Sequence, residues 1–222
     1  MKQSHIYYDL PYLETVKAKV IDAFEEASYF HLAFDNNLFH MHGGGQPGDI
    51  CFVDNYQADQ LMNKNGITYV SFKKDSFFYK DFKRYSTLSI DLSHRNICSA
   101  LHTAGHLLNA YMSSLGHDYF SCNHYPGQAR VEFKEGYKKI NKDKLTRLIE
   151  AEVSQFILQD VPVFSLLKQD GTRLVKIKGI ALDSCGGTHV RSLGEIKGFK
   201  VRSLKYKKEH LIVGYNCTYF DI

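Results

Sequence analysis

Four residues in two separate segments have the chemistry and spacing of a zinc site. In SCGGTH at 184–189, the thiol of Cys185 and the imidazole of His189 are four residues apart, with two glycines between them. Both groups are preferred zinc ligands, and the glycines allow a short loop to bring them to one ion. In HTAGH, His102 and His106 have the spacing that puts two imidazoles on one helix face. We therefore predict one zinc site from these four residues.

A glycine-rich segment, FHMHGGGQPGD at 39–49, is the third stretch suited to ligand binding. Three consecutive glycines followed by Gln46 and Pro47 exclude a helix or an ordinary central strand. Such a loop lets the backbone approach a ligand closely, and the Gln46 side chain can both donate and accept hydrogen bonds. The alternative is a tight hairpin loop. We interpret the nearby His40 and His42 as surface or packing residues rather than ligands.

The composition indicates a folded protein with reduced cysteines. Of the 222 residues, 44% are hydrophobic and 14% aromatic, which suits one large domain or two small ones. The five cysteines are odd in number and widely scattered, unlike a secreted disulfide framework. The N-terminal segment lacks the apolar core of a signal peptide, and no later apolar run is long enough to cross a membrane. We expect a soluble cytoplasmic protein without a membrane partner.

The formal net charge of +4 is mild, but the basic residues are concentrated in two segments. The first contains Lys134, Lys138, Lys139, Lys142, Lys144 and Arg147, and the second contains Lys197, Lys200, Arg202, Lys205, Lys207 and Lys208. Such segments could bind phosphates, because affinity for a polyanion depends on the local field more than on net charge. The alternative is that both are solvated faces of a helix and of strands.

Residues 1–92 have the pattern of a small β-barrel. Apolar and basic residues alternate over 16–20, and further β-type runs follow at 29–34, 67–72 and 85–90. Asn65-Gly66 predicts a hairpin turn before residue 67. We predict a β-barrel domain over residues 1–92 that carries the glycine-rich loop. Its boundary is expected near Ser93, where the periodicity becomes helical.

The next segment predicts a long helix that separates packing residues from site residues. Ser93 is its expected N-cap and Gly116 its stop. An apolar stripe is expected to enter the core, and it consists of Ile97, Leu101, Ala104, Leu108, Met112 and Leu115. A second face has small and polar residues, namely Cys98, His102, Gly105, His106 and Asn109. One rigid helix would therefore both fill the core and present two ligands.

The remaining chain mixes one helix with strands. Asn141 or Asp143 can cap the helix, whose apolar face is predicted to contain Leu145, Leu148, Ile149, Val153, Phe156 and Ile157. Strands are expected at 129–133, 161–167, 174–180, 199–204 and 211–215, with a turn at 169–171. This mixture indicates an α+β fold with helices on one face of a sheet. Residues 93–222 are predicted to form this two-layer α/β zinc domain.

Three motifs together resemble the AlaX family of freestanding alanyl-tRNA editing proteins, relatives of the editing domain of alanyl-tRNA synthetase. They are HTAGHLL at 102–108, CGGTHV at 185–190 and GGGQPGD at 43–49. Their order and spacing are similar to the medium-length form, in which a β-barrel precedes the zinc domain. The two metal motifs alone would also fit threonyl-tRNA synthetase, and the glycine-glutamine loop favours the alanyl branch. His40-Met41-His42 departs from the Tyr-Pro-Glu usual in the family.

The resemblance implies a hydrolase that removes wrongly attached serine, and in second place glycine, from the 3′ end of tRNA(Ala). Its partner would be tRNA and not DNA. Zinc is expected on His102, His106 and Cys185, with His189 either a fourth ligand or a side chain beside an open position. The expected catalytic residues are Thr103, Gln46, Gly186 and Gly187. The expected substrate-binding residues are Gly44, Gly45, Gln46, Thr103 and Thr188.

Individual roles follow from the chemistry of these side chains. Thr103 and Gln46 are candidates for sensing the seryl hydroxyl or holding the terminal ribose, and the alternative for Thr103 is helix packing. The amides of Gly186 and Gly187 could stabilise a developing oxyanion. No acidic residue in the motifs is an obvious general base, and we interpret Asp183 as a loop cap.

Other functions fit the same motifs. A structural zinc module that binds RNA would have a closed four-ligand site, and Cys185→Ala would unfold it or separate its domains. A zinc hydrolase of small esters or amides would not need tRNA, and salt would change its activity little, whereas recognition of RNA phosphates weakens steeply with salt. Deacylation of Ser-tRNA(Thr) is a further alternative.

Overall fold

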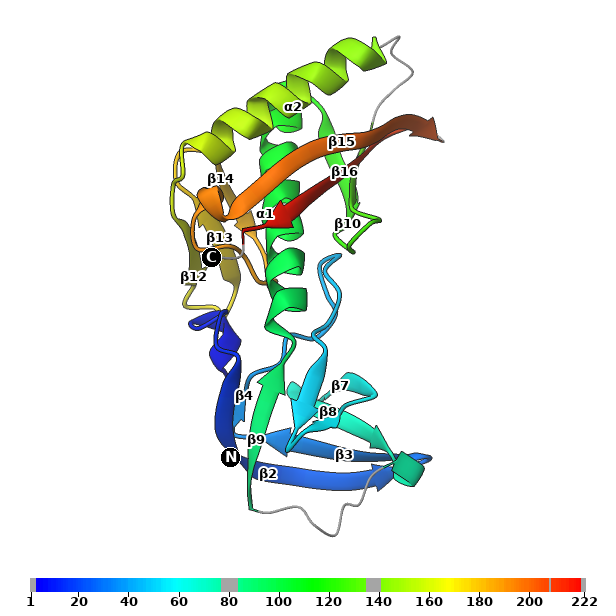
Figure 1. Ribbon diagram of the computed structural model, residues 1–222, viewed down its shortest axis with the longest axis vertical. Helices are drawn as coiled ribbons and strands as arrows, with labels where there is room; N and C mark the ends of the chain where they lie inside the picture. The colour runs from blue at the N-terminus through cyan, green and yellow to red at the C-terminus, as the bar shows by residue number, and fades with distance from the viewer. Residues whose placement is uncertain (1–2, 77–83, 135–140, 208, 221–222) are drawn as a thin grey trace. The chain divides into compact units, whose positions relative to one another are not determined.

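The computed structural model describes residues 3–76, 84–134, 141–207 and 209–220, and the chain divides into two compact units. The first unit consists of Met1–His42 and Pro47–Arg95, and the second of Gly43–Gln46 and Asn96–Ile222. Most of the regular secondary structure is β-strand, and two long helices complete an α+β fold, as predicted (Figure 1). Within the described ranges, no helix is both long and apolar enough to span a bilayer. The assignment of two separate domains stays a prediction.

A curled seven-stranded antiparallel sheet forms most of the first unit. In sheet order its strands are β6 (Tyr56–Gln57), β5 (Cys51–Val53), β9 (Tyr85–Ile90), β2 (Thr15–Glu26), β3 (Tyr29–Phe34), β8 (Ile67–Lys73) and β7 (Gln60–Lys64). The long β2 pairs first with β9 and then with β3, and a register shift lies between Val20 and Asp22. Among the described residues no pairing joins β6 to β7, so the sheet is a half-barrel and a closed barrel is not confirmed.

Smaller elements complete this unit. A parallel pair joins β1 (Ser4–His5) to β4 (Asn36–Asn37), and 3-10 turns cover Ile6–Tyr8 and Lys74–Ser76. The predicted hairpin is confirmed, because Lys64 pairs with Ile67 and both turn residues between them have positive φ.

The helix α1 (Leu92–Ser114) begins earlier than predicted because its cap is Asp91 and not Ser93. The Asp91 carboxylate accepts a hydrogen bond of 2.9 Å from the His94 amide, which fulfils one of the unpaired donors of a helix start. Gly116, at φ +83°, ends the helix as predicted. Leu115 lies beyond the helical end and is 48% exposed, so its assignment to the packing stripe was wrong.

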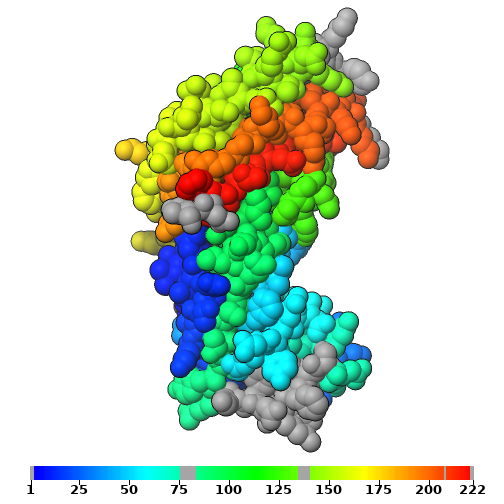
Figure 2. Space-filling model, in the orientation of Figure 1, coloured from blue at the N-terminus to red at the C-terminus, as the bar shows by residue number. Residues whose placement is uncertain are grey.

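The second unit is built on the sheet order β10-β11-β16-β15. These strands are β10 (Asp118–Asn123), β11 (Arg130–Lys134), β16 (His210–Tyr219) and β15 (Ile196–Lys207), with a 3-10 turn at Leu193–Glu195 before β15. Val131 of β11 and Val213 of β16 share one core with Leu108 of α1 and Ile149 of α2 (Lys142–Leu158). Both helices therefore pack on the sheet, and Figure 2 shows α2 beside β15 on the molecular surface.

A second sheet holds the cysteine segment. It has the antiparallel order β12 (Val163–Leu167), β13 (Arg173–Ile177) and β14 (Ala181–Ser184), and β14 leads directly into Cys185. The predicted turn lies between β12 and β13, where Gly171 donates to Lys168 at 3.0 Å. Neither β14 nor β10 was predicted, because both are short and lack a regular alternation of apolar and polar residues.

The predicted N-cap of α2 is confirmed, whereas its predicted buried face is wrong at one residue. Asn141 caps the helix, since its side-chain oxygen accepts a 2.9 Å hydrogen bond from the Lys144 amide. Leu148 is 44% exposed, so its place on the buried face was wrong, whereas Leu145, Ile149 and Val153 are buried as expected. The basic residues Lys138, Lys139 and Lys208 lie outside the described residues.

A buried ion pair fixes the helix start to the chain that follows the glycine-rich loop. The Arg95 guanidinium binds both carboxylate oxygens of Asp49, and the two side chains are 0% and 2% exposed. Arg95 also donates to the carbonyls of Leu38 at 2.8 Å and Pro11 at 3.1 Å. Because these partners satisfy the charges, the pair can persist inside the first unit.

Asp49→Ala should lower the free energy of unfolding by about 3–5 kcal/mol, since it leaves Arg95 buried and unpaired. Urea denaturation followed by circular dichroism measures this loss. The matched control is Glu26→Ala, which removes a largely exposed pair with Lys64 and should cost less than about 1 kcal/mol. Equal effects of the two substitutions would contradict the assignment.

Candidate metal centre and adjoining cavity

The four predicted metal ligands meet in the second unit. The ligand atoms of His102, His106, Cys185 and His189 all lie within 4.8 Å of one another. The Cys185 sulfur is 3.2 Å from His189 Nε2 and 3.4 Å from His102 Nε2. His106 Nε2 is buried and forms no hydrogen bond with any described residue. This group of donors could hold a metal ion, and three imidazoles with one thiolate suit zinc.

The Gln46 side chain determines which nitrogen of His102 faces the cluster. Gln46 Oε1 accepts a 3.0 Å hydrogen bond from the Thr188 amide, which can only donate, so this atom is the oxygen. The same oxygen is 2.8 Å from His102 Nδ1, which must therefore carry the proton. Gln46 Nε2 donates to Thr188 Oγ1 at 2.7 Å and completes the contact. His102 consequently presents the lone pair of Nε2 toward Cys185.

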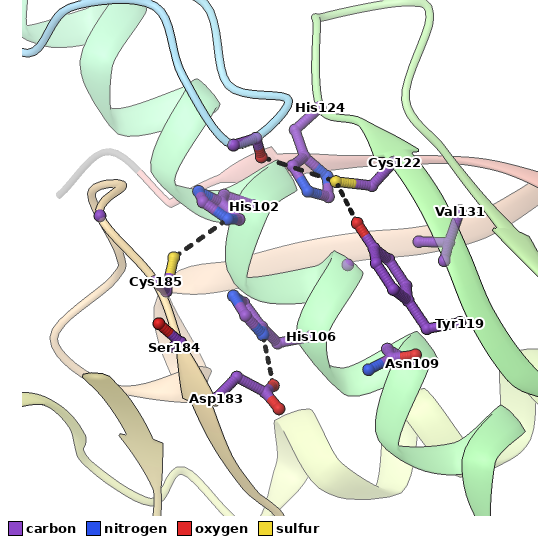
Figure 3. A pocket seen from close by; sticks show the side chains of 13 residues that line it. His102, His106, Asn109, Tyr119, Cys122, His124, Val131, Asp183, Ser184 and Cys185 are labelled. Atoms are coloured by element: carbon purple, nitrogen blue, oxygen red, sulfur yellow. Dashed lines mark hydrogen bonds and ion pairs between the residues drawn. The ribbon is translucent and has the colours of Figure 1, made fainter. Parts of the chain in front are cut away.

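The other two histidines are oriented in the same way by different partners. His106 Nδ1 lies 2.7 Å from a carboxylate oxygen of Asp183, which belongs to β14 and not to a loop (Figure 3). Thr103 Oγ1 donates to the Ser99 carbonyl at 2.8 Å, so it can only accept from His189 Nδ1 at 3.2 Å. Each ring thus has its Nδ1 hydrogen-bonded and its Nε2 available, as is usual for histidines that bind metals.

His106 and Asp183 shift each other's pKa. Burial acts to lower the pKa of His106, but its contacts with Asp183 and Cys185 outweigh this effect and raise the pKa to about 9. The hydrogen bond from His106 lowers the pKa of the Asp183 carboxyl below its usual value. Asp183 was interpreted as a loop cap from the sequence, whereas its side chain is a direct partner of His106.

The glycine-rich loop is a hairpin that also reaches the cluster. Gly43 and Gln46 exchange backbone hydrogen bonds of 3.0 and 3.1 Å across Gly44 and Gly45, which both have positive φ. A side chain at Gly45 would meet the Cys122 sulfur at 2.8 Å, so the close approach requires glycine. The alternative of a tight hairpin loop is therefore confirmed, and this turn directs Gln46 to His102. A contact of the loop with a ligand stays a prediction.

A cavity of about 330 Å³ adjoins the cluster. Gly44 and Gly186 line it together with the metal-site residues His102, His106 and Cys185. Of the other predicted residues, Thr103 and Thr188 are fully buried beside the ligands. The Gly187 amide donates to the Cys185 sulfur at 3.4 Å. The roles of these residues toward a substrate stay predictions.

Sequence reasoning missed one wall of this cavity. Tyr119 and Cys122 of β10 and the following His124 line it, and the Tyr119 hydroxyl donates to the Cys122 sulfur at 3.2 Å (Figure 3). None of these three residues belongs to a motif with metal-ligand spacing, so the sequence does not single them out. Asn109 lines the cavity on the predicted helix face, whereas Cys98 is buried and lies outside the lining. All five cysteines are described, and none forms a disulfide.

The known proteins to which the chain is similar include an alanyl-tRNA editing protein and alanine–tRNA ligases. The family model "Threonyl and Alanyl tRNA synthetase second additional domain" matches residues 172–211. The chain is 28% identical to the alanyl-tRNA editing protein AlaX-L of Pyrococcus horikoshii, over 96% of this chain and 58% of that protein. It is 25% identical to the alanine–tRNA ligase of Methanococcus aeolicus, over 88% of this chain and 23% of the ligase.

A chloroplastic/mitochondrial alanine–tRNA ligase of Oryza sativa subsp. indica gives a similar match, with 24% identity over 85% of this chain and 22% of the ligase. The chain therefore spans somewhat over half of the matched editing protein and less than a quarter of each matched ligase. The resemblance inferred from the three motifs is confirmed by these matches.

Zinc affinity should fall as the pH falls, because zinc can bind His106 only after Nε2 loses its proton. With its pKa raised to about 9, this group alone should weaken apparent affinity about tenfold per pH unit below that value. Competition titrations with a chromophoric chelator from about pH 6 to 8 measure the slope. An affinity independent of pH in this range would contradict the prediction.

Gln46→Leu should weaken zinc binding about 10- to 100-fold, because His102 loses the acceptor that orients its ring. Gln46→Glu keeps an acceptor at the same place and should retain most of the affinity. Equilibrium dialysis followed by metal analysis measures both variants. Gln155→Leu, on an exposed position of α2, is the control for a general effect of the substitution. Unchanged affinity in Gln46→Leu would refute the orienting role.

Proposed function

Because the chain is related to the alanyl-tRNA editing proteins of the AlaX family, we propose that it is a zinc-dependent hydrolase that removes wrongly attached serine from tRNA(Ala). One observation carries the proposal. Three histidines present Nε2 toward one cysteine sulfur at the wall of a cavity of about 330 Å³. This volume is at the low end for small-molecule sites, which suits an aminoacyl ester better than a whole nucleotide. The protein would act in the cytoplasm.

The choice of serine has a physical basis. A pocket that activates alanine cannot exclude the smaller glycine by size, and it poorly rejects an analogue that only adds a hydroxyl. A second site that requires the hydroxyl discriminates better, because an alanyl group would leave the buried polar groups of that site unpaired. Serine on tRNA(Ala) is therefore the expected principal substrate, and glycine a secondary one.

The proposed reaction is hydrolysis of the ester between the amino acid and the terminal ribose. Zinc held by His102, His106, Cys185 and His189 would supply a Lewis acid that orients or polarises the aminoacyl group. Around these ligands, Gln46 and Asp183 keep the rings in one orientation. His189 presents Nε2 to the Cys185 sulfur as His102 does, which supports its inclusion as a fourth ligand.

The tRNA body would be bound by basic residues outside the cavity. Lys205 and Lys207 of β15 belong to the second basic segment. Lys200 and Arg202 are partly engaged within the protein, by Glu150 at 3.4 Å and by the Ala129 carbonyl at 3.2 Å. Because phosphate contacts release counterions, hydrolysis of an aminoacyl-tRNA at subsaturating concentration should slow steeply as salt is added.

The direct test is deacylation of Ser-, Gly- and Ala-tRNA(Ala) and of Ser-tRNA(Thr) by the zinc-loaded protein. We expect serine to be released from tRNA(Ala) much faster than alanine, and a chelator to abolish the reaction. Absence of serine release would overturn the proposal. Faster release from tRNA(Thr) would assign the protein to the other tRNA, and salt-insensitive cleavage of a simple seryl ester would indicate a small-molecule hydrolase.

Cys185→Ala distinguishes a catalytic from a structural metal site. A folded variant is expected, with unchanged circular dichroism and deacylation reduced at least about 100-fold, because the metal would lose its only sulfur ligand. Cys51→Ala, which changes a buried cysteine in the first unit, is the control for loss of a thiol. Unfolding of Cys185→Ala with a folded control would favour a structural zinc module.

A further inference from the structure

His124 is a buried histidine on the cavity wall that the metal site does not use. It follows β10, is 3% exposed and lies outside the group of four metal ligands. Its ring stacks on that of His102, with centroids 4.5 Å apart and planes inclined by 21°. Its backbone amide donates to the Gly45 carbonyl at 2.8 Å, so the glycine-rich hairpin helps to hold it.

A hydrogen-bond chain fixes the proton on the His124 ring. The Tyr215 hydroxyl donates to the Leu101 carbonyl at 2.9 Å, and a carbonyl can only accept. Because a phenol has one proton, the same hydroxyl must accept from His124 Nδ1, which lies 2.7 Å away. In the neutral ring, Nε2 is then an unprotonated acceptor.

The helix surface leaves room for this arrangement only because residue 105 is glycine. A Cβ there would lie 2.4 Å from His124 Cε1 and 2.7 Å from the Tyr215 hydroxyl. The Nδ1–Cε1 edge of the ring is therefore packed against α1. No residue in the described part of the chain forms a hydrogen bond with Nε2, and the ring lines the cavity. Nε2 is thus the polar ring atom left for a ligand.

Resting on the proposed function, we propose that His124 is a specificity residue whose Nε2 accepts a hydrogen bond from the β-hydroxyl of the seryl group. A seryl group satisfies this acceptor. An alanyl methyl group would cover the acceptor without pairing it, and a glycyl group would not reach it, so neither gains the bond. His124 would therefore favour serine over alanine and glycine without contributing to metal binding.

The test compares His124→Phe with the unmodified protein on Ser-, Gly- and Ala-tRNA(Ala). Phenylalanine keeps a flat aromatic ring that can stack on His102 but has no hydrogen-bond acceptor. The expected result is a fall of about 10- to 100-fold in kcat/KM for the seryl substrate, with glycyl and alanyl hydrolysis changed less than about threefold. Bound zinc and circular dichroism should stay unchanged. Equal losses on the seryl and glycyl substrates would overturn the proposal.

A spectroscopic measurement on the unmodified protein does not depend on how the variant folds. The probes are non-hydrolysable amides in which serine or alanine is joined to the 3′ position of an aminoadenosine. The nitrogen-15 resonance of His124 Nε2 should have the chemical shift of an unprotonated ring nitrogen. It should move toward hydrogen-bonded values with the seryl amide and not with the alanyl amide, and identical responses to both would refute the assignment.

The two proposals fail in different ways. If the unmodified protein does not release serine from tRNA(Ala), the proposed function is wrong. If it releases serine and His124→Phe retains the full preference for serine over alanine, the function stands and the role of His124 is wrong.

Tyr215→Phe supplies a third readout, because loss of the hydroxyl removes the partner that fixes the tautomer of His124. It should lower the seryl preference while leaving bound zinc unchanged.

Discussion

Convergence of three imidazole nitrogens on one sulfur is the constraint on which the second unit depends. Each ring is held through Nδ1 by a different partner, Gln46, Asp183 or Thr103, and these partners come from a hairpin, a strand and a helix. No single element could impose this geometry. The site is therefore a property of the packed unit, and its precision comes from hydrogen bonds behind the ligands rather than from the ligands themselves.

The same elements build the cavity beside the metal cluster. The α1 helix contributes two ligands and Gly105, where the missing side chain admits His124 and Tyr215. The glycine hairpin approaches Cys122 so closely that a side chain at Gly45 would collide with it. Metal ligands and cavity walls are thus held by shared backbone positions but use different side chains.

Two histidines of the second unit, His106 and His124, have opposite pKa shifts. His106 shares a hydrogen bond with Asp183, and the negative charge of that carboxylate favours a proton or a cation on the ring. Burial, and to a smaller extent the charge of His106, lower the pKa of His124 to about 3. The His124 ring is therefore neutral in ordinary buffers. His106 is thus disposed to bind a cation, and His124, whose ring stacks on that of His102, is disposed to accept a hydrogen bond.

The sequence alone determined the ligand types, their helical and loop spacing, the long helix with its glycine stop, and the resemblance carried by three motifs. These follow from local rules, since spacing along a helix fixes which side chains share a face. Local rules also misplaced Leu115, because periodicity does not tell where a helix ends, and Leu148, because periodicity does not tell how wide the buried face of a helix is. Only the tertiary structure decided that Asp183 binds His106, that Gln46 orients His102 and that His124 stands on the cavity wall. Those contacts join residues 56 to 91 positions apart, and chain folding, not sequence spacing, brings such residues together.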